Sequence, residues 1–82
     1  MNERESVRSF VGNLLTQKGD ARELTDGEAL LTSGRLDSID VLDLIAFLEG
    51  EFGVDFSKRD FNQNDFDSVE EILRVVESLR PA

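Results

Sequence analysis

The chain has 82 residues, 39% of them hydrophobic, which is enough for a single domain over residues 1–82 with one modest core. It contains neither cysteine nor histidine, which excludes disulfides, thiolate nucleophiles and a Ser-His-Asp site, so we do not expect an enzyme. Eighteen acidic residues against nine basic ones give a net charge of −9, which disfavours nucleic acid and anionic membranes and favours partners with basic faces.

The beginning of the chain is charged and is not followed by the apolar run of a signal peptide. No stretch of the sequence approaches the length of a membrane span. Together with the missing cysteines, these features lead us to expect a cytoplasmic protein.

A first helix is predicted from about residue 3 to residue 18, and Gly19 can end it. Its core-facing residues recur at helical spacing: Val7, Phe10, Val11, Leu14 and Leu15. Residues 19–36 then form a connection that is long for a compact domain and calls for an explanation. Its leucines are expected to reach the core: Leu24, Leu30, Leu31 and Leu36.

A second helix is predicted to begin at Asp37-Ser38, where either side chain can cap it, and to end near Phe52-Gly53. Its apolar residues fall on two sides of a helical wheel. One side forms a core stripe: Val41, Leu44, Leu48 and Phe52, with Ile45 beside them and Phe47 at the border. The other side has acidic margins: Ile39, Leu42 and Ala46, flanked by Asp43, Glu49 and Gly50.

The pattern on this second side predicts an exposed docking surface, because docking surfaces typically combine an apolar strip with charged margins. The alternative is a helix buried nearly all round, but Asp43 and Glu49 would be costly to bury unpaired.

Between residues 54 and 67, phenylalanines recur at positions 56, 61 and 66, which predicts one or two short helical turns with each ring in the core. A last helix starts at Ser68, whose spacing to Glu71 is that of a capping box. Its core stripe comprises Val69, Ile72, Val75, Val76 and Leu79, before Arg80-Pro81 ends it. The predicted fold class is all-α, a bundle of three principal helices plus one short helix.

The ten residues 31–40, LTSGRLDSID, resemble the signature that precedes the second helix of acyl and peptidyl carrier proteins, with Ile39 in place of the commoner leucine. Residues 48–54 and 66–72 resemble the end of the second helix and the start of the last helix in the same family. The resemblance therefore covers nearly the whole chain. It implies an acyl-carrier-like bundle and a stand-alone acyl carrier protein.

The resemblance implies that Ser38 carries 4′-phosphopantetheine, moved from coenzyme A by a separate phosphopantetheinyl transferase. The thiol of this arm would hold acyl or aminoacyl cargo as a thioester. The neighbouring Asp37 would help to orient the transferase or its metal, or would simply cap the helix. A phosphodiester on Ser38 would be tolerated at the positive end of a helix.

The same resemblance assigns the recognition of basic partner enzymes to one face: Ile39, Leu42, Asp43, Ala46 and Glu49. Gly50 stands where many members have an acid. The implied partners are the transferase, an acyl- or aminoacyl-loading ligase, and downstream acyl-processing enzymes with basic docking faces. We expect a monomer without catalytic residues or a metal site.

The cargo stays open. Residues 52–56 and 60–67 are similar to the D-alanyl carrier proteins of teichoic acid modification, whereas Ser38-Ile39-Asp40 departs from the Ser-Met-Gly of that group. Fatty acyl, polyketide, aminoacyl and nonribosomal peptide cargo all fit a carrier of this kind.

Two alternatives have different functions. An unmodified acidic helical adaptor would use the same second helix for binding alone. A calcium-binding protein would use residues 60–71, which place oxygen ligands at positions 1, 3, 5, 9 and 12 of an EF-hand loop. However, Asp65 replaces the glycine at position 6, Asp67 replaces the aliphatic residue at position 8, and there is no second loop.

Overall fold

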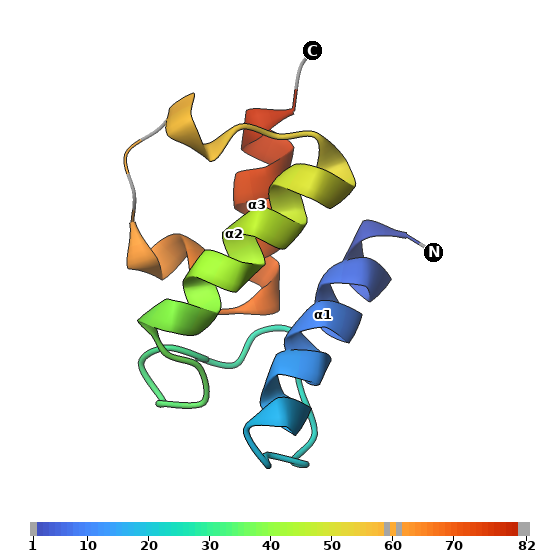
Figure 1. Ribbon diagram of the computed structural model, residues 1–82, viewed down its shortest axis with the longest axis vertical. Helices are drawn as coiled ribbons and strands as arrows, with labels where there is room; N and C mark the ends of the chain where they lie inside the picture. Colours follow the sequence, from blue (N-terminus) through green and yellow to red (C-terminus); the bar gives the residue numbers. More distant parts are fainter. Residues whose placement is uncertain (1, 59, 61, 81–82) are drawn as a thin grey trace.

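The computed structural model describes residues 2–58, 60 and 62–80, and every regular element within these ranges is helical. The elements are, in chain order, α1 (Glu3–Gln17), α2 (Ser38–Phe52), the 3-10 helices η1 (Phe56–Lys58) and η2 (Gln63–Phe66), and α3 (Val69–Leu79). In Figure 1, α2 crosses the front of the molecule beside α1, and α3 lies behind it. The predicted all-α bundle is confirmed, with the short helical region divided into two turns.

None of the helices in the described ranges combines the length and the hydropathy that crossing a membrane requires.

The helix boundaries follow from local side-chain and backbone chemistry. At the start of α3, the Ser68 hydroxyl accepts the backbone N–H of Glu71 at 3.1 Å, which is one bond of the predicted capping box. The Glu71 carboxylate itself pairs with Arg74. At the end of α2, Gly53 has a φ of 68°, the left-handed conformation that glycine adopts without steric cost.

The core lies where the three α-helices meet, and the predicted stripes supply it. The buried apolar residues of the helices are Val7, Val11, Leu14, Leu15, Val41, Leu44, Leu48, Val69, Ile72, Val75 and Val76. Other segments add Leu30, Leu36, Val54 and Phe66. Burying each large aliphatic or aromatic side chain contributes about 1.5–3 kcal/mol before chain entropy is subtracted. The loop leucines Leu24 and Leu31 pack against this core while half-buried.

Aromatic rings join the helices at two places. Phe10 of α1 stacks on Phe47 of α2 with ring centroids 4.2 Å apart, which places Phe47 at the α1–α2 contact. Phe56 of η1 lies against the buried Phe66 of η2, with centroids 5.5 Å apart. Two of the three regularly spaced rings therefore reach the core as predicted, and Phe61 lies outside the described residues.

Candidate functional site

Asp37, rather than Ser38, caps α2. Its Oδ1 accepts the backbone N–H of Ile39 at 3.0 Å and that of Asp40 at 3.1 Å, and Asp40 Oδ2 accepts the Asp37 N–H at 3.0 Å. This reciprocal arrangement is a capping box. Ser38 is consequently the first residue of the helix, is exposed to solvent, and keeps its hydroxyl out of the cap.

Lys18, just beyond α1, ties the end of that helix to the start of α2. Its Nζ lies 3.2 Å from Asp37 Oδ2 and 2.8 Å from Asp40 Oδ2. The hydrogen bond from the Asp40 N–H, followed by that from Lys18, holds the pKa of Asp37 below its usual value. The pKa of Lys18 is raised, first by Asp40 and then by Asp37. The residue before Ser38 is therefore a fixed, ionised carboxylate.

A groove of about 360 Å³ opens beside Ser38. It is lined by apolar and polar residues from the loop before α2, from the start of α2, from η2 and from the residue after η2: Leu31, Thr32, Gly34, Leu36, Asp37, Ser38, Gln63, Asn64 and Asp67. Its size is within the range of small-ligand sites. Across this groove, Gln63 Nε2 donates to Ser38 Oγ at 3.2 Å.

Asp67, which also lines the groove, is bonded to the loop before α2. Its Oδ1 accepts the backbone N–H groups of Leu30, Leu31 and Thr32 at 3.1, 2.7 and 3.0 Å, and its Oδ2 accepts the Thr32 hydroxyl at 3.1 Å. Burial raises the pKa of Asp67, but the hydrogen bonds from Thr32, Leu31 and Leu30 outweigh burial and leave the pKa below its usual value. The carboxylate therefore fixes the loop before α2 to the residues before α3.

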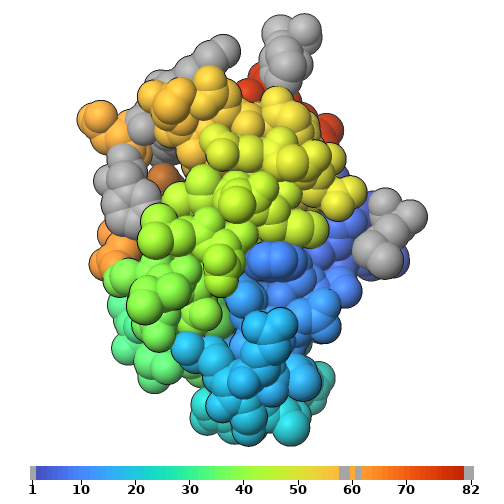
Figure 2. Space-filling model, viewed as in Figure 1, coloured from blue at the N-terminus to red at the C-terminus, as the bar shows by residue number. Residues whose placement is uncertain are grey.

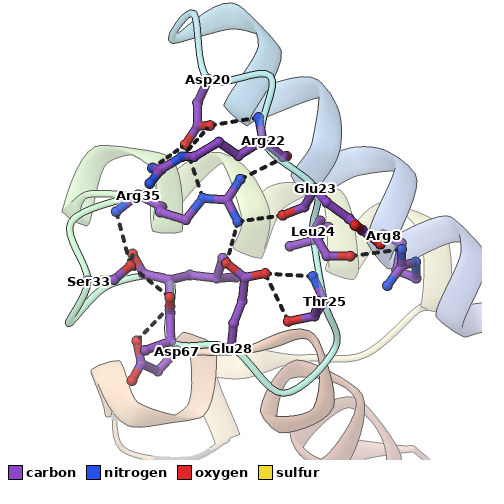
Figure 3. A network of polar contacts seen from close by, with 12 residues as sticks. Arg8, Asp20, Arg22, Glu23, Leu24, Thr25, Glu28, Ser33, Arg35 and Asp67 are labelled. Atoms are coloured by element: carbon purple, nitrogen blue, oxygen red, sulfur yellow. Dashed lines mark hydrogen bonds and ion pairs between the residues drawn. The ribbon is translucent and has the colours of Figure 1, made fainter.

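A buried arginine organises the long connection between α1 and α2 (Figure 3). The Arg35 side chain is only 6% exposed; its Nε lies 3.0 Å from Asp20 Oδ2, and its Nη1 pairs with Glu28. The guanidinium also donates to the backbone carbonyls of Glu23 and Arg22, each at 3.1 Å. Asp20 and then Glu28 raise the pKa of Arg35. This cluster explains how so long a loop stays folded against the domain.

Sequence reasoning missed the roles of Asp67 and Arg35. Both lie within segments that resemble carrier proteins, but the hydrogen-bond partners of Asp67 are 35 to 37 positions away. The sequence did contain one signal for the Arg35 cluster: this arginine belongs to a loop that is rich in acidic residues and glycines, where it could find a carboxylate partner. No periodicity marks residues in such a loop, because they follow neither helical nor strand spacing.

The outer side of α2 is exposed, as predicted. Ile39 is 71% exposed and Leu42 is 66% exposed; the other exposed residues of this side are Asp43, Ala46 and Glu49. Figure 2 shows α2 running across the visible face of the molecule in green to yellow. The Glu49 carboxylate also accepts the backbone N–H of Phe56 at 3.1 Å, so it anchors η1 while facing solvent.

Three of the residues proposed as calcium ligands serve other purposes in the structure. The Asn62 side chain accepts the Asn64 N–H to cap η2, Ser68 caps α3, and Glu71 pairs with Arg74. Over the described part of the chain, no three acidic or other metal-ligating side chains gather into a candidate metal site.

Comparison with known proteins gives one finding. A family model described as a phosphopantetheine attachment site matches residues 6–76. The matched range runs from within α1 to within α3 and includes Ser38, the groove and the exposed side of α2. No curated protein and no solved structure gives a significant match.

Proposed function

The chain belongs to the phosphopantetheine attachment family, whose members are carrier proteins with a covalently attached 4′-phosphopantetheine, and we propose that Ser38 bears that group here. The observation that carries the proposal is the exposed Ser38 hydroxyl, which stands at the start of α2, outside the capping box and beside the groove. Other serines are occupied differently: Ser33 donates to the Ala29 carbonyl, and Ser68 is buried as the cap of α3.

Modification is a phosphoryl-type transfer at the Ser38 oxygen. Ser38 Oγ forms a bond to the phosphorus of the pantetheine phosphate in coenzyme A, and the bond from that phosphorus to adenosine 3′,5′-bisphosphate breaks. The hydroxyl proton passes to a base on the transferase, because the neighbouring Asp37 carboxylate is already engaged by two backbone N–H groups and by Lys18. When bound, the arm supplies a terminal thiol on which an acyl or aminoacyl group is carried as a thioester.

The residues around Ser38 fit such a group. The exposed hydroxyl is accessible to a second protein, and the groove beside it offers both apolar and hydrogen-bonding surface to a pantetheine arm. The Asp37 carboxylate is engaged by two backbone N–H groups and by Lys18. Its contribution to modification is therefore to hold Ser38 at the first position of a rigid helix.

We assign the docking of partner enzymes to the exposed side of α2. Ile39 and Leu42 present apolar surface that the bundle leaves uncovered, and Asp43 provides a negative margin beside them. With a net charge of −9, the chain would attract basic faces over a distance, and the apolar contacts would set the register. The proposed partners are the phosphopantetheinyl transferase, the loading ligase and downstream acyl-processing enzymes.

Intact mass measurement tests the attachment residue. The chain is incubated with coenzyme A, Mg²⁺ and a promiscuous phosphopantetheinyl transferase. We expect the mass to rise by one phosphopantetheine, and we expect Ser38→Ala to abolish this gain. Ser9→Ala, which changes an exposed serine of α1, is the matched control and should be modified normally. If the mass stays unchanged with several transferases, and if Ser38→Ala binds partner proteins as well as the wild type does, the adaptor alternative would be favoured.

A further inference from the structure

The Ser38 oxygen is contacted from a segment 25 positions further along the chain. Gln63, the first residue of η2, donates its Nε2–H to Ser38 Oγ at 3.2 Å. A hydroxyl oxygen has two lone pairs and one hydrogen to donate. The Gln63 amide uses one lone pair and leaves the O–H hydrogen available to a base on another protein.

Gln63 is held in place from both ends of η2. Ahead of it, the Asn62 side chain caps the turn by accepting the Asn64 N–H at 3.0 Å. Behind it, Phe66 is buried in the core, and Asp67 is bonded to the loop that leads into α2. The fold therefore fixes the backbone position of Gln63, from which its side-chain amide reaches Ser38 Oγ.

Two of the backbone donors that could receive a phosphate at the start of α2 are already in use. An anion at a helix N-terminus is bound by the first N–H groups, but Asp37 Oδ1 accepts those of Ile39 and Asp40. The Asp37 carboxylate is also a negative charge beside Ser38. A phosphodiester on Ser38 consequently meets fewer free backbone donors than at an uncapped helix start, and the Gln63 amide is a side-chain donor that already contacts this oxygen.

We propose that Gln63 is a positioning residue for the attachment site: its amide orients the Ser38 oxygen before modification and donates to a phosphate oxygen of the attached arm afterwards. The proposal rests on Ser38 being the attachment residue. Once Ser38 Oγ becomes an ester oxygen it is a weaker acceptor than the charged phosphate oxygens beside it. A small movement of the Gln63 amide within the groove would replace its hydrogen bond to Ser38 Oγ with one to a phosphate oxygen. This bond would keep η2 next to the phosphate end of the arm.

The test compares Gln63→Ala and Gln63→Glu with Gln17→Ala, a control at an exposed glutamine at the end of α1. The initial rate of mass gain is measured with coenzyme A, Mg²⁺ and a promiscuous transferase. We expect Gln63→Ala to slow modification about threefold to tenfold, which corresponds to one lost hydrogen bond. Gln63→Glu should slow it further, because a carboxylate cannot donate and repels the phosphate. Gln17→Ala should react at the wild-type rate.

A second readout does not depend on the rate. In ¹⁵N-labelled protein, the Gln63 side-chain amide resonances, identified by their loss in Gln63→Ala, should shift on modification, whereas those of Gln17 should not. Unchanged Gln63 resonances, together with wild-type rates in both Gln63 variants, would overturn the inference while leaving Ser38 attachment intact. A mass gain that persists in Ser38→Ala would instead overturn the attachment proposal. The isosteric Gln63→Glu variant keeps the test valid if Gln63→Ala perturbs η2.

Discussion

The Asp67 carboxylate accepts the backbone N–H of Leu31 at 2.7 Å, across 36 positions of the chain. This bond and its neighbours join the residues before α3 to the loop that leads into α2. Ser38 follows that loop and Gln63 precedes Asp67, so the contact between Ser38 and Gln63 depends on this connection.

Removing the Asp67 carboxylate should destabilise the bundle. Asp67→Ala leaves the backbone N–H groups of Leu31 and Thr32 without their acceptor, whereas the Leu30 N–H keeps the Asp67 backbone carbonyl at 2.6 Å. We expect a loss of about 2–4 kcal/mol in the free energy of unfolding. Asp67→Asn keeps one acceptor oxygen and should cost less. Urea unfolding followed by circular dichroism measures both. Asp43→Asn, at an exposed position of α2, is the control and should change stability by less than about 0.5 kcal/mol.

Arg35 should be among the residues least tolerant of change. Arg35→Met would leave the carboxylates of Asp20 and Glu28 without their buried cation, a type of loss that costs about 3–5 kcal/mol. A domain of this size has only about that much stability in total, so we expect no cooperative thermal transition. Arg35→Lys keeps the charge with fewer donors and should be intermediate.

Arg74→Met provides the comparison for Arg35. The Arg74 side chain is 71% exposed and pairs with Glu71 on the same helix, an arrangement worth about 0.5 kcal/mol or less. A melting temperature close to wild type is expected for this variant. If Arg35→Met melted as cooperatively as Arg74→Met, the structural role assigned to the Arg35 cluster would be wrong.

Substitutions of two leucines that lie two positions apart on α2 should distinguish a loss of docking from a loss of stability. Leu42 is 66% exposed and Leu44 is fully buried. Leu44→Ala should cost about 2–5 kcal/mol through the cavity it leaves, whereas Leu42→Ala should barely change unfolding. Leu42→Ala should nevertheless reduce kcat/KM for the transferase, since a minority of interface residues contribute more than about 1 kcal/mol each and a central apolar anchor is placed to be one of them. Equal transferase kinetics for Leu42→Ala and wild type would argue against docking on this side of α2.

Stability should fall in acid. The pKa values of Asp20, Asp37 and Asp67 are lowered in the folded state, whereas an unfolded aspartate titrates near pH 3.9. Below about pH 5 the unfolded chain therefore binds more protons than the folded one, and stability decreases as the pH falls through the folded pKa values. The urea midpoint measured from pH 7 to pH 2.5 should decline over this range.

Asp67→Asn supplies the control for the acid response. This variant lacks one of the carboxylates with a lowered pKa, so its urea midpoint should fall less steeply below pH 4 than that of the wild type. A wild-type midpoint that stays level down to pH 2.5 would contradict the ionised state assigned to these aspartates.

Much of the fold could be predicted from periodicity. The spacing of Val7, Val11 and Leu14 predicts a helix with one buried face, and these residues are buried in α1. The two-sided pattern of α2 predicts an exposed strip, and Ile39 and Leu42 are the large apolar residues that remain exposed. Periodicity is informative here because helical side chains point outward at a fixed angular interval.

By itself the sequence determined the class of fold, the ends of the main helices, and a serine beside an aspartate at the start of α2. Only the tertiary structure decided that Asp37 is the cap, that Asp67 and Arg35 hold the loop, and that Gln63 contacts Ser38. The reason is physical: helical stripes depend on neighbours a few residues away, whereas the contacts of Arg35, Gln63 and Asp67 join groups 7 to 37 positions apart. The Asp37 cap is local, but the sequence offers Ser38 as an equal candidate, and only the folded structure decides between them. Such contacts have no repeat in the chain, and they exist only once the apolar stripes have brought the helices together.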